Sequence, residues 1–83
     1  MIYYVYILIS EKDCKRYIGL TTELERRIKE HNSGRTKSTK SRTPFRLEYF
    51  EKFDNIVEAR SREKYFKSSA GRRYLVKIQK SKS

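Results

Sequence analysis

Seven consecutive apolar residues near the start of the chain, YYVYILI over Tyr3–Ile9, constrain the fold most. The run is rich in β-branched and aromatic side chains, which predicts a buried β-strand. The turn EKDCK follows, and Arg16–Leu20 predicts a second, short strand, so the two strands form a hairpin. Because side chains alternate along a strand, the more aliphatic set is expected to face the main core and the other set to face away: Tyr3, Val5, Ile7 and Ile9 against Tyr4, Tyr6 and Leu8.

The number of residues in the hairpin turn decides which residues oppose each other. A turn with an even number of residues places Tyr6 opposite Gly19. Tyr6 and Tyr17 then share one face as diagonal neighbours, and the missing side chain at Gly19 leaves a gap that suits close approach of a ligand. A turn with an odd number would separate the tyrosines, and the preference of tyrosine for strands also explains both without a site.

A helix and a polar loop are predicted next. The sequence TELE, Thr22–Glu25, has the pattern of a capping box that opens a helix running to about His31. Gly34 is the expected left-handed residue just past its end. The polar segment Asn32–Pro44 is then expected to be a loop.

The second half of the chain predicts one more strand and two helices. The strand Phe45–Phe53 is expected to alternate Phe45, Leu47 and Tyr49 with Arg46, Glu48 and Lys52. Asp54 and Asn55 are expected to cap a helix from Ile56 to about Ala70, which Gly71 stops. A last short helix is expected over Arg72–Lys80, with Tyr74, Leu75 and Ile78 inward. Residues 1–80 then form one domain and 81–83 a disordered basic tail.

Charge is the strongest indication of the partner. Twenty-one Lys and Arg against ten Asp and Glu give a formal net charge of +11 in 83 residues. Such an excess favours a polyanion, most commonly nucleic acid, although a merely basic protein or a membrane-surface binder also fits. No stretch approaches the roughly 18 apolar residues of a membrane span, no signal peptide is recognisable, and one cysteine excludes an internal disulfide. A cytoplasmic location is therefore expected.

The first helix carries two polar residues on its apolar side. At 100° per residue from Leu24, His31 falls at about −20° and Arg27 at about −60°, beside the buried stripe, whereas Arg26 points to solvent. An arginine at the edge of a core needs an anionic partner or an exit to water. A histidine at a helix C-terminus also has a structural explanation, because it interacts favourably with the helix dipole.

The second helix places a carboxylate among apolar side chains. Glu63 lies at about −20° from Ile56, in the middle of the stripe that Ala59 and Phe66 define. A carboxylate there must be paired, protonated or bound to a metal. An ion pair with Arg60 or Lys67 is the structural alternative.

Four cations without any acid or apolar anchor lie in the polar loop. We expect them to contact phosphates, because small hydroxyl residues interleaved with cations suit that role: Arg35, Lys37, Lys40 and Arg42.

These residues together resemble a known family. The tripeptides Tyr4–Tyr6 and Tyr17–Gly19, separated by eleven residues from Tyr6 to Tyr17, resemble the two halves of the GIY-YIG signature, with Tyr4 and Val5 replacing the first glycine and isoleucine. The helix with Arg27 and His31 and the later Glu63 resemble the rest of the pattern. The resemblance covers about Ile2 to Phe66 and is nearest to the small bacterial single-domain branch, the UvrC-like and UPF0213-type proteins.

The resemblance implies an α+β fold, a three-stranded antiparallel sheet flanked by helices. It implies hydrolysis of nucleic-acid phosphodiesters, DNA first, by an endonuclease with a divalent cation, Mg²⁺ or Mn²⁺. By this resemblance Glu63 holds the metal, Arg27 stabilises developing negative charge, Tyr6 orients or deprotonates water, and Tyr17 and His31 assist. Gly19 joins the four loop cations as an expected nucleic-acid contact.

Two departures from the family pattern leave alternatives open. The family commonly has an asparagine after the metal glutamate, and here none follows Asn55. No second domain is present in this sequence to bring specificity, so activity is expected to be structure-selective or dependent on a protein partner. The alternatives are a nucleic-acid-binding module with a vestigial nuclease site, and a basic interaction or structural subunit.

Overall fold

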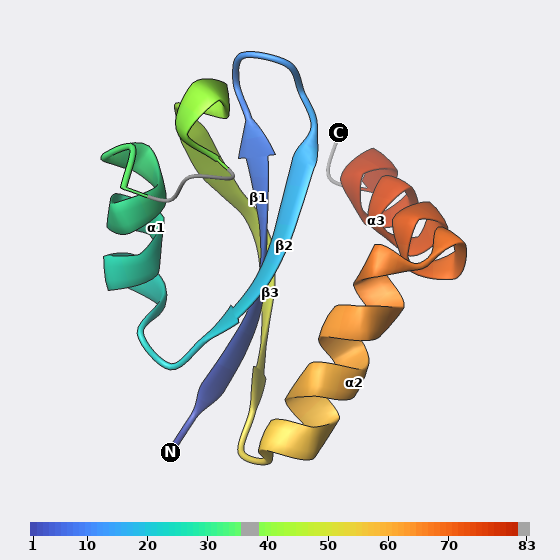
Figure 1. The fold of residues 1–83 in the computed structure, drawn as a ribbon. Coiled ribbons are helices and arrows are strands. Elements are labelled where there is room, and N and C mark those ends of the chain that lie inside the picture. Colours follow the sequence, from blue (N-terminus) through green and yellow to red (C-terminus); the bar gives the residue numbers. More distant parts are fainter. Residues whose placement is uncertain (36–38, 82–83) are drawn as a thin grey trace.

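The computed structural model describes residues 1–35 and 39–81 and consists of one sheet between two helical layers (Figure 1). The strands are antiparallel in the order β2-β1-β3, which puts β1 in the centre. Helix α1 covers one face of the sheet, and α2 and α3 cover the other (Figure 1). The predicted fold class is therefore confirmed. The elements are β1 Tyr3–Ser10, β2 Arg16–Thr21, α1 Leu24–Asn32, the 3₁₀ turn η1 Lys40–Arg42, β3 Phe45–Phe53, α2 Ile56–Lys67 and α3 Ser69–Ser81.

The hairpin has the register expected for an even-length turn. Tyr6 opposes Gly19 in the β1–β2 ladder. Just beyond the strand ladder the Ser10 N–H donates to the Lys15 carbonyl at 2.9 Å, so four residues, Glu11–Cys14, lie between the members of this pair. Cys14 has a left-handed φ of 60° and donates its backbone N–H to the carbonyl of Ser10 at 2.9 Å. Tyr6 and Tyr17 consequently lie on the same face, with ring centroids 6.4 Å apart.

Each face of the sheet carries its own hydrophobic cluster. The α2–α3 side holds the larger one, which has the odd positions of β1, as expected, and consists of buried Val5, Ile7, Ala59, Phe66 and Leu75 with partly buried neighbours. The α1 side holds Tyr6, Leu8 and Phe45, with Tyr17, Leu24, Ile28 and Leu47 packed against them. The strand run that dominates the sequence is therefore buried on both faces.

A β-bulge breaks the alternation expected for β3. Ile7 pairs with Tyr49, but Leu8 pairs with Leu47, which leaves Glu48 as the extra residue. Leu47 consequently packs on the α1 side, while Tyr49 packs on the α2–α3 side. The prediction that Leu47 and Tyr49 share a face was wrong because of this one inserted position.

The N-terminus of α1 is not the predicted capping box. The residue before the helix is Glu23, whose side chain accepts no capping hydrogen bond. Its backbone N–H instead donates to the Thr21 hydroxyl at 3.1 Å. The end of α1 agrees with the prediction, since Gly34 has a φ of +79° and its N–H donates to the His31 carbonyl.

The last two helices meet at Ser68 rather than at Gly71. Asn55 caps α2 as predicted and accepts from the backbone N–H of Val57 at 2.8 Å. The helix ends at Lys67, and Ser68 accepts from the Gly71 N–H at 3.2 Å and donates to the Tyr65 carbonyl. Gly71 lies inside α3, where an added Cβ would overlap the Tyr65 carbonyl. The glycine therefore permits close packing of α3 on α2 and does not stop a helix.

The last helix extends into the segment that was expected to be a tail. Of the expected tail, Ser81 is the last residue of α3, whereas Lys82 and Ser83 lie outside the described residues. None of the helices in the described part of the chain has the length and hydrophobicity needed to cross a bilayer.

Candidate active site

A chain of three hydrogen-bonded side chains lies between the sheet and α1. The Tyr6 hydroxyl is 3.0 Å from Nε2 of His31, and Nδ1 of His31 is 2.9 Å from the Thr39 hydroxyl. All three residues are buried, with exposed fractions of 1% or less. The helix position predicted for His31 is therefore correct, and hydrogen bonds engage both of its ring nitrogens.

The surroundings of His31 favour its neutral form. Burial lowers its pKa from the ordinary value of 6.5, and the positive charge of Arg27 lowers it further. A neutral imidazole has one donor and one acceptor nitrogen. When the Tyr6 hydroxyl donates to Nε2, Nδ1 carries the ring proton and donates to Thr39. His31 is then ready to accept the tyrosine proton.

Tyr17 completes the aromatic side of this site. Its ring centroid is 4.7 Å from that of His31, and the ring of Phe45 lies 6.2 Å away from His31 on another side. Two aromatic rings and the hydrogen bonds thus fix the imidazole. The structure thus brings Tyr6, Tyr17 and His31 together.

Arg27 lies beside the Tyr6 hydroxyl. Burial raises the pKa of Tyr6, whereas hydrogen bonding and charge from Arg27 oppose that rise. The same interaction with Tyr6 raises the pKa of Arg27. The arginine also contacts Glu30 at 3.5 Å, and its side chain is 35% exposed. It therefore has the exit to water that the sequence required, while Arg26 is the exposed partner of Glu23.

The space beside Gly19 is filled rather than open. Gly19 is buried, and a Cβ added there would overlap the hydroxyl and ring of Tyr6. The expectation of a gap for a ligand over Gly19 is therefore revised. The missing side chain allows the Tyr6 ring to lie across the edge strand β2.

Glu63 reaches this region from the other helical layer. Burial is the main cause that raises the pKa of Tyr6, and the charge of Glu63 adds a smaller contribution in the same direction. The Glu63 side chain is 24% exposed, and its Oε2 pairs with Lys67 Nζ at 3.3 Å. Of the two alternatives for an ion pair, the structure has the one with Lys67.

The metal ligands available around Glu63 are few. Within the described residues no three or more His, Cys, Asp or Glu side chains cluster as a metal site. Glu63 supplies a partly exposed carboxylate whose Oε1 has no hydrogen bond to any described residue. One hard oxygen ligand open to water fits an ion that keeps most of its own hydration shell, as Mg²⁺ does.

The loop cations occupy different environments. Arg35 and Lys40 are exposed, and Lys37 lies outside the described residues. Arg42 is anchored, contrary to expectation: its Nε is 3.2 Å from Asp13 Oδ2, and its guanidinium lies 5.6 Å from the centroid of the Phe45 ring. Its backbone carbonyl also accepts from Ser10. Part of the loop is thus held against the β1–β2 turn and Phe45, which its polar composition did not indicate.

The sequence patterns did not predict the role of two residues in this site. Thr39 was read as part of a solvated loop, although it is fully buried against His31. Asn32 is expected to begin the polar loop, although its side chain donates to the Phe45 carbonyl at 2.9 Å and accepts from the Phe45 N–H at 2.6 Å. Both act across the chain, so no local pattern marks them.

The sequence comparisons establish the family. Residues 2–75 match the family model described as the GIY-YIG catalytic domain. The chain belongs to the GIY-YIG family. The predicted resemblance is confirmed, and with it a place among nuclease domains.

Relatives of this GIY-YIG domain carry the UPF0213 name. UPF0213 protein CPE1444 of Clostridium perfringens is 54% identical over 65 residues, which are 77% of this chain and 69% of that protein. UPF0213 protein SH2523 of Staphylococcus haemolyticus is 41% identical over 78 residues, 93% of this chain and 94% of that protein. The solution NMR structure of UPF0213 protein BH0048 from Bacillus halodurans matches with a TM-score of 0.58 at 42% identity, covering 94% of this chain and 85% of that one.

Proposed function

We propose that this GIY-YIG domain is a divalent-metal-dependent endonuclease that hydrolyses phosphodiester bonds in DNA. The observation that carries the proposal is the buried chain Tyr6–His31–Thr39 beside Arg27. A buried tyrosine hydrogen-bonded to a neutral histidine is costly to build and serves proton transfer better than packing. The net charge of +11 supports a polyanionic substrate.

Tyr6 is the proposed base or water-orienting group. An isolated tyrosine near pKa 10 is a weak base, and burial raises the Tyr6 pKa further. His31 offsets this by accepting the hydroxyl proton at Nε2, so that the tyrosine oxygen can take a proton from the attacking water. Tyr17 keeps the imidazole in place by ring contact.

Arg27 and Glu63 are the proposed charged groups of the site. The half-exposed Arg27 guanidinium can donate to the phosphoryl oxygens on which charge develops in the transition state. Glu63 would hold the cation through its carboxylate. A bound Mg²⁺ or Mn²⁺ supplies neutralisation of the scissile phosphate and of the departing oxygen.

The decisive experiment is single-turnover cleavage with two variants. Single-stranded, flap, branched and duplex substrates of DNA and RNA are incubated with Mg²⁺, Mn²⁺ or chelator. We expect metal-dependent cleavage by the wild type and a loss of at least about a hundredfold in Glu63→Gln. Lys67→Met is the matched control, because it breaks the same ion pair and leaves the carboxylate.

Stability separates a structural role from a catalytic one. A partly exposed i,i+4 pair contributes about 0.3–0.5 kcal/mol, so both variants should lose a similar, small part of the free energy of unfolding. Equal cleavage by Glu63→Gln and the wild type would overturn the metal assignment. Binding without cleavage by the wild type would instead favour the nucleic-acid-binding module.

A further inference from the structure

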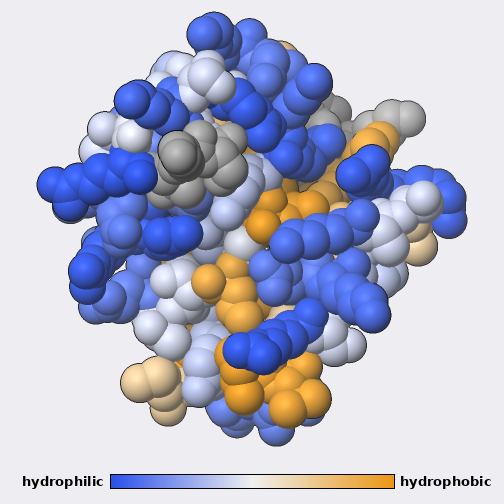
Figure 2. Space-filling model, viewed as in Figure 1, coloured by the Kyte–Doolittle hydropathy of each residue, from blue (hydrophilic) through white to orange (hydrophobic). Residues whose placement is uncertain are grey.

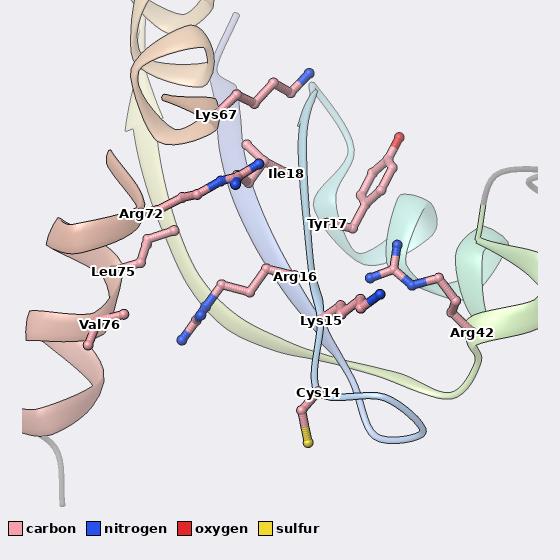
Figure 3. A pocket seen from close by; sticks show the side chains of 10 residues that line it. All are labelled: Cys14, Lys15, Arg16, Tyr17, Ile18, Arg42, Lys67, Arg72, Leu75 and Val76. Carbon is pink, nitrogen blue, oxygen red and sulfur yellow. The ribbon is translucent and has the colours of Figure 1, made fainter. Parts of the chain in front are cut away.

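A groove along the outer side of the edge strand β2 is not used by the proposed chemistry. It encloses about 520 Å³ between β2, the start of α3 and the end of α2. In Figure 3, Arg16 and Ile18 extend from β2 toward α3, and Tyr17 extends to the other side of the strand. The groove therefore wraps around an edge that no other strand of the described chain covers.

The charge of the groove has one sign. Its lining holds five cations and no acidic residue: Lys15, Arg16, Arg42, Lys67 and Arg72. Arg16, Arg42 and Lys67 are fixed by ion pairs with acids outside the lining. Lys15 and Arg72 make no ion pair with any described residue. These two cations are available for an anionic ligand.

The floor of the groove is apolar. Ile18, Leu75 and Val76 contribute to the lining, and Val76 is 42% exposed. Figure 2 shows hydrophobic surface in the middle of this face, where β2 and α3 lie, with hydrophilic side chains on both sides. Cations around an apolar floor suit a ligand that offers phosphates and a flat apolar group together.

The groove is continuous with the candidate active site. Tyr17 lines it and contacts the ring of His31 at a centroid distance of 4.7 Å. Lys67 lines it and pairs with Glu63. A nucleic-acid strand that passes the proposed cleavage site would therefore enter this groove next.

We propose that the β2–α3 groove binds the single-stranded part of the nucleic-acid substrate, with Lys15 and Arg72 on phosphates and Val76 against an unpaired base. Bases in a duplex are stacked inside and cannot reach such a floor, whereas unpaired bases can. The proposal rests on the proposed endonuclease function and names its substrate class, a strand that is unpaired beside the scissile bond.

Binding in the presence of chelator tests the groove separately from cleavage. The probe is a fluorescent single-stranded DNA of about 12 nucleotides, within the usual site size of such proteins. Lys15→Glu/Arg72→Glu is compared with Arg46→Glu/Lys52→Glu, a pair of exposed cations on β3 at the opposite edge of the sheet. Both double variants change the net charge equally, so long-range electrostatics are matched.

We expect the groove pair to weaken binding at least tenfold more than the control pair. The slope of log affinity against log salt should fall in magnitude by about 1.4 for two lost single-strand phosphate contacts. An abasic oligonucleotide should bind the wild type more weakly than the ordinary one, and Val76→Asn should remove that difference. Thermal unfolding of each variant confirms that the folded protein is being measured.

The outcomes separate the two proposals. Equal losses in both double variants would overturn the groove even if the wild type cleaves DNA. Groove-dependent binding without metal-dependent cleavage would uphold the groove and refute the nuclease. Tighter, groove-dependent binding of a polyglutamate peptide than of the oligonucleotide would also overturn the proposal, in favour of an acidic protein partner.

Discussion

Gly19→Ala is the sharpest test of how the site is built. The added methyl group would overlap the hydroxyl and ring of Tyr6, and Tyr6 is almost fully buried. The ring must therefore move, and its 3.0 Å hydrogen bond to His31 is lost. We expect a folded protein with a displaced tyrosine and a strongly reduced cleavage rate.

The expected loss of stability follows from three contributions. Overpacking a buried position costs about 1–3 kcal/mol. Separating a buried hydroxyl from its partner costs about 1–3 kcal/mol more. Replacing glycine offsets about 0.4–1 kcal/mol by reducing the freedom of the unfolded chain. The middle of each range gives a net loss of about 3 kcal/mol, which corresponds to a fall in Tm of roughly 12–24 °C for a domain of this size.

A double-mutant cycle checks the reasoning. Leucine at position 6 lacks the atoms that the new methyl group would meet, so Gly19→Ala should cost little in a Tyr6→Leu background. Thermal and urea unfolding of the four proteins give the coupling energy, expected at about 1–3 kcal/mol. The explanation fails if Gly19→Ala is as stable as the wild type, or if it destabilises both backgrounds equally.

Three further predictions concern groups around and behind the site. Because burial lowers the pKa of His31 in the folded protein below 6.5, the free energy of unfolding should decline as pH falls from about 6.5 towards the lowered pKa, where the unfolded chain binds the proton more readily, and the cleavage rate should decline as pH falls through the lowered pKa; a rate that rises in acid would contradict this. Thr39→Val should strand Nδ1 of His31, lowering stability by about 1–3 kcal/mol and shifting the acidic limb of the pH profile, with Thr39→Ser restoring both. Arg62→Ala removes both donors to Glu51 and a cation that lies 4.7 Å from the centroid of the Tyr65 ring. The free energy of unfolding measured with urea should therefore fall by about 1–3 kcal/mol. An unchanged unfolding midpoint would show that these contacts of Arg62 do not stabilise the fold.

The sequence predicted the parts of the site that depend on local periodicity. Strand alternation places Tyr6 and Tyr17 on one face once the turn has the even length that the structure shows, and helix periodicity places Arg27 and His31 toward that face. Each of these follows from the spacing of a few neighbouring residues. The fold class followed from the family resemblance.

The remainder depends on contacts between distant segments. Thr39 is buried only because η1 folds back over α1, and Asn32 binds Phe45 thirteen residues away. The break at Ser68 arises where Gly71 packs against the end of α2. Such positions carry no periodic signal, since their partners are chosen by the tertiary fold.

The bulge in β3 has a consequence for how this strand can change length. Glu48 is the extra residue, and its neighbours Leu47 and Tyr49 already point to opposite faces of the sheet. Removing Glu48 would therefore leave every other side chain of β3 on its present face, whereas removing any other residue between Phe45 and Phe53 would turn part of the strand over. The deletion would remove the ion pair between Arg16 Nε and Glu48 Oε1, which are 2.6 Å apart. Glu48, the bulge residue, is therefore the position in β3 at which one residue can be deleted while both hydrophobic clusters keep their side chains.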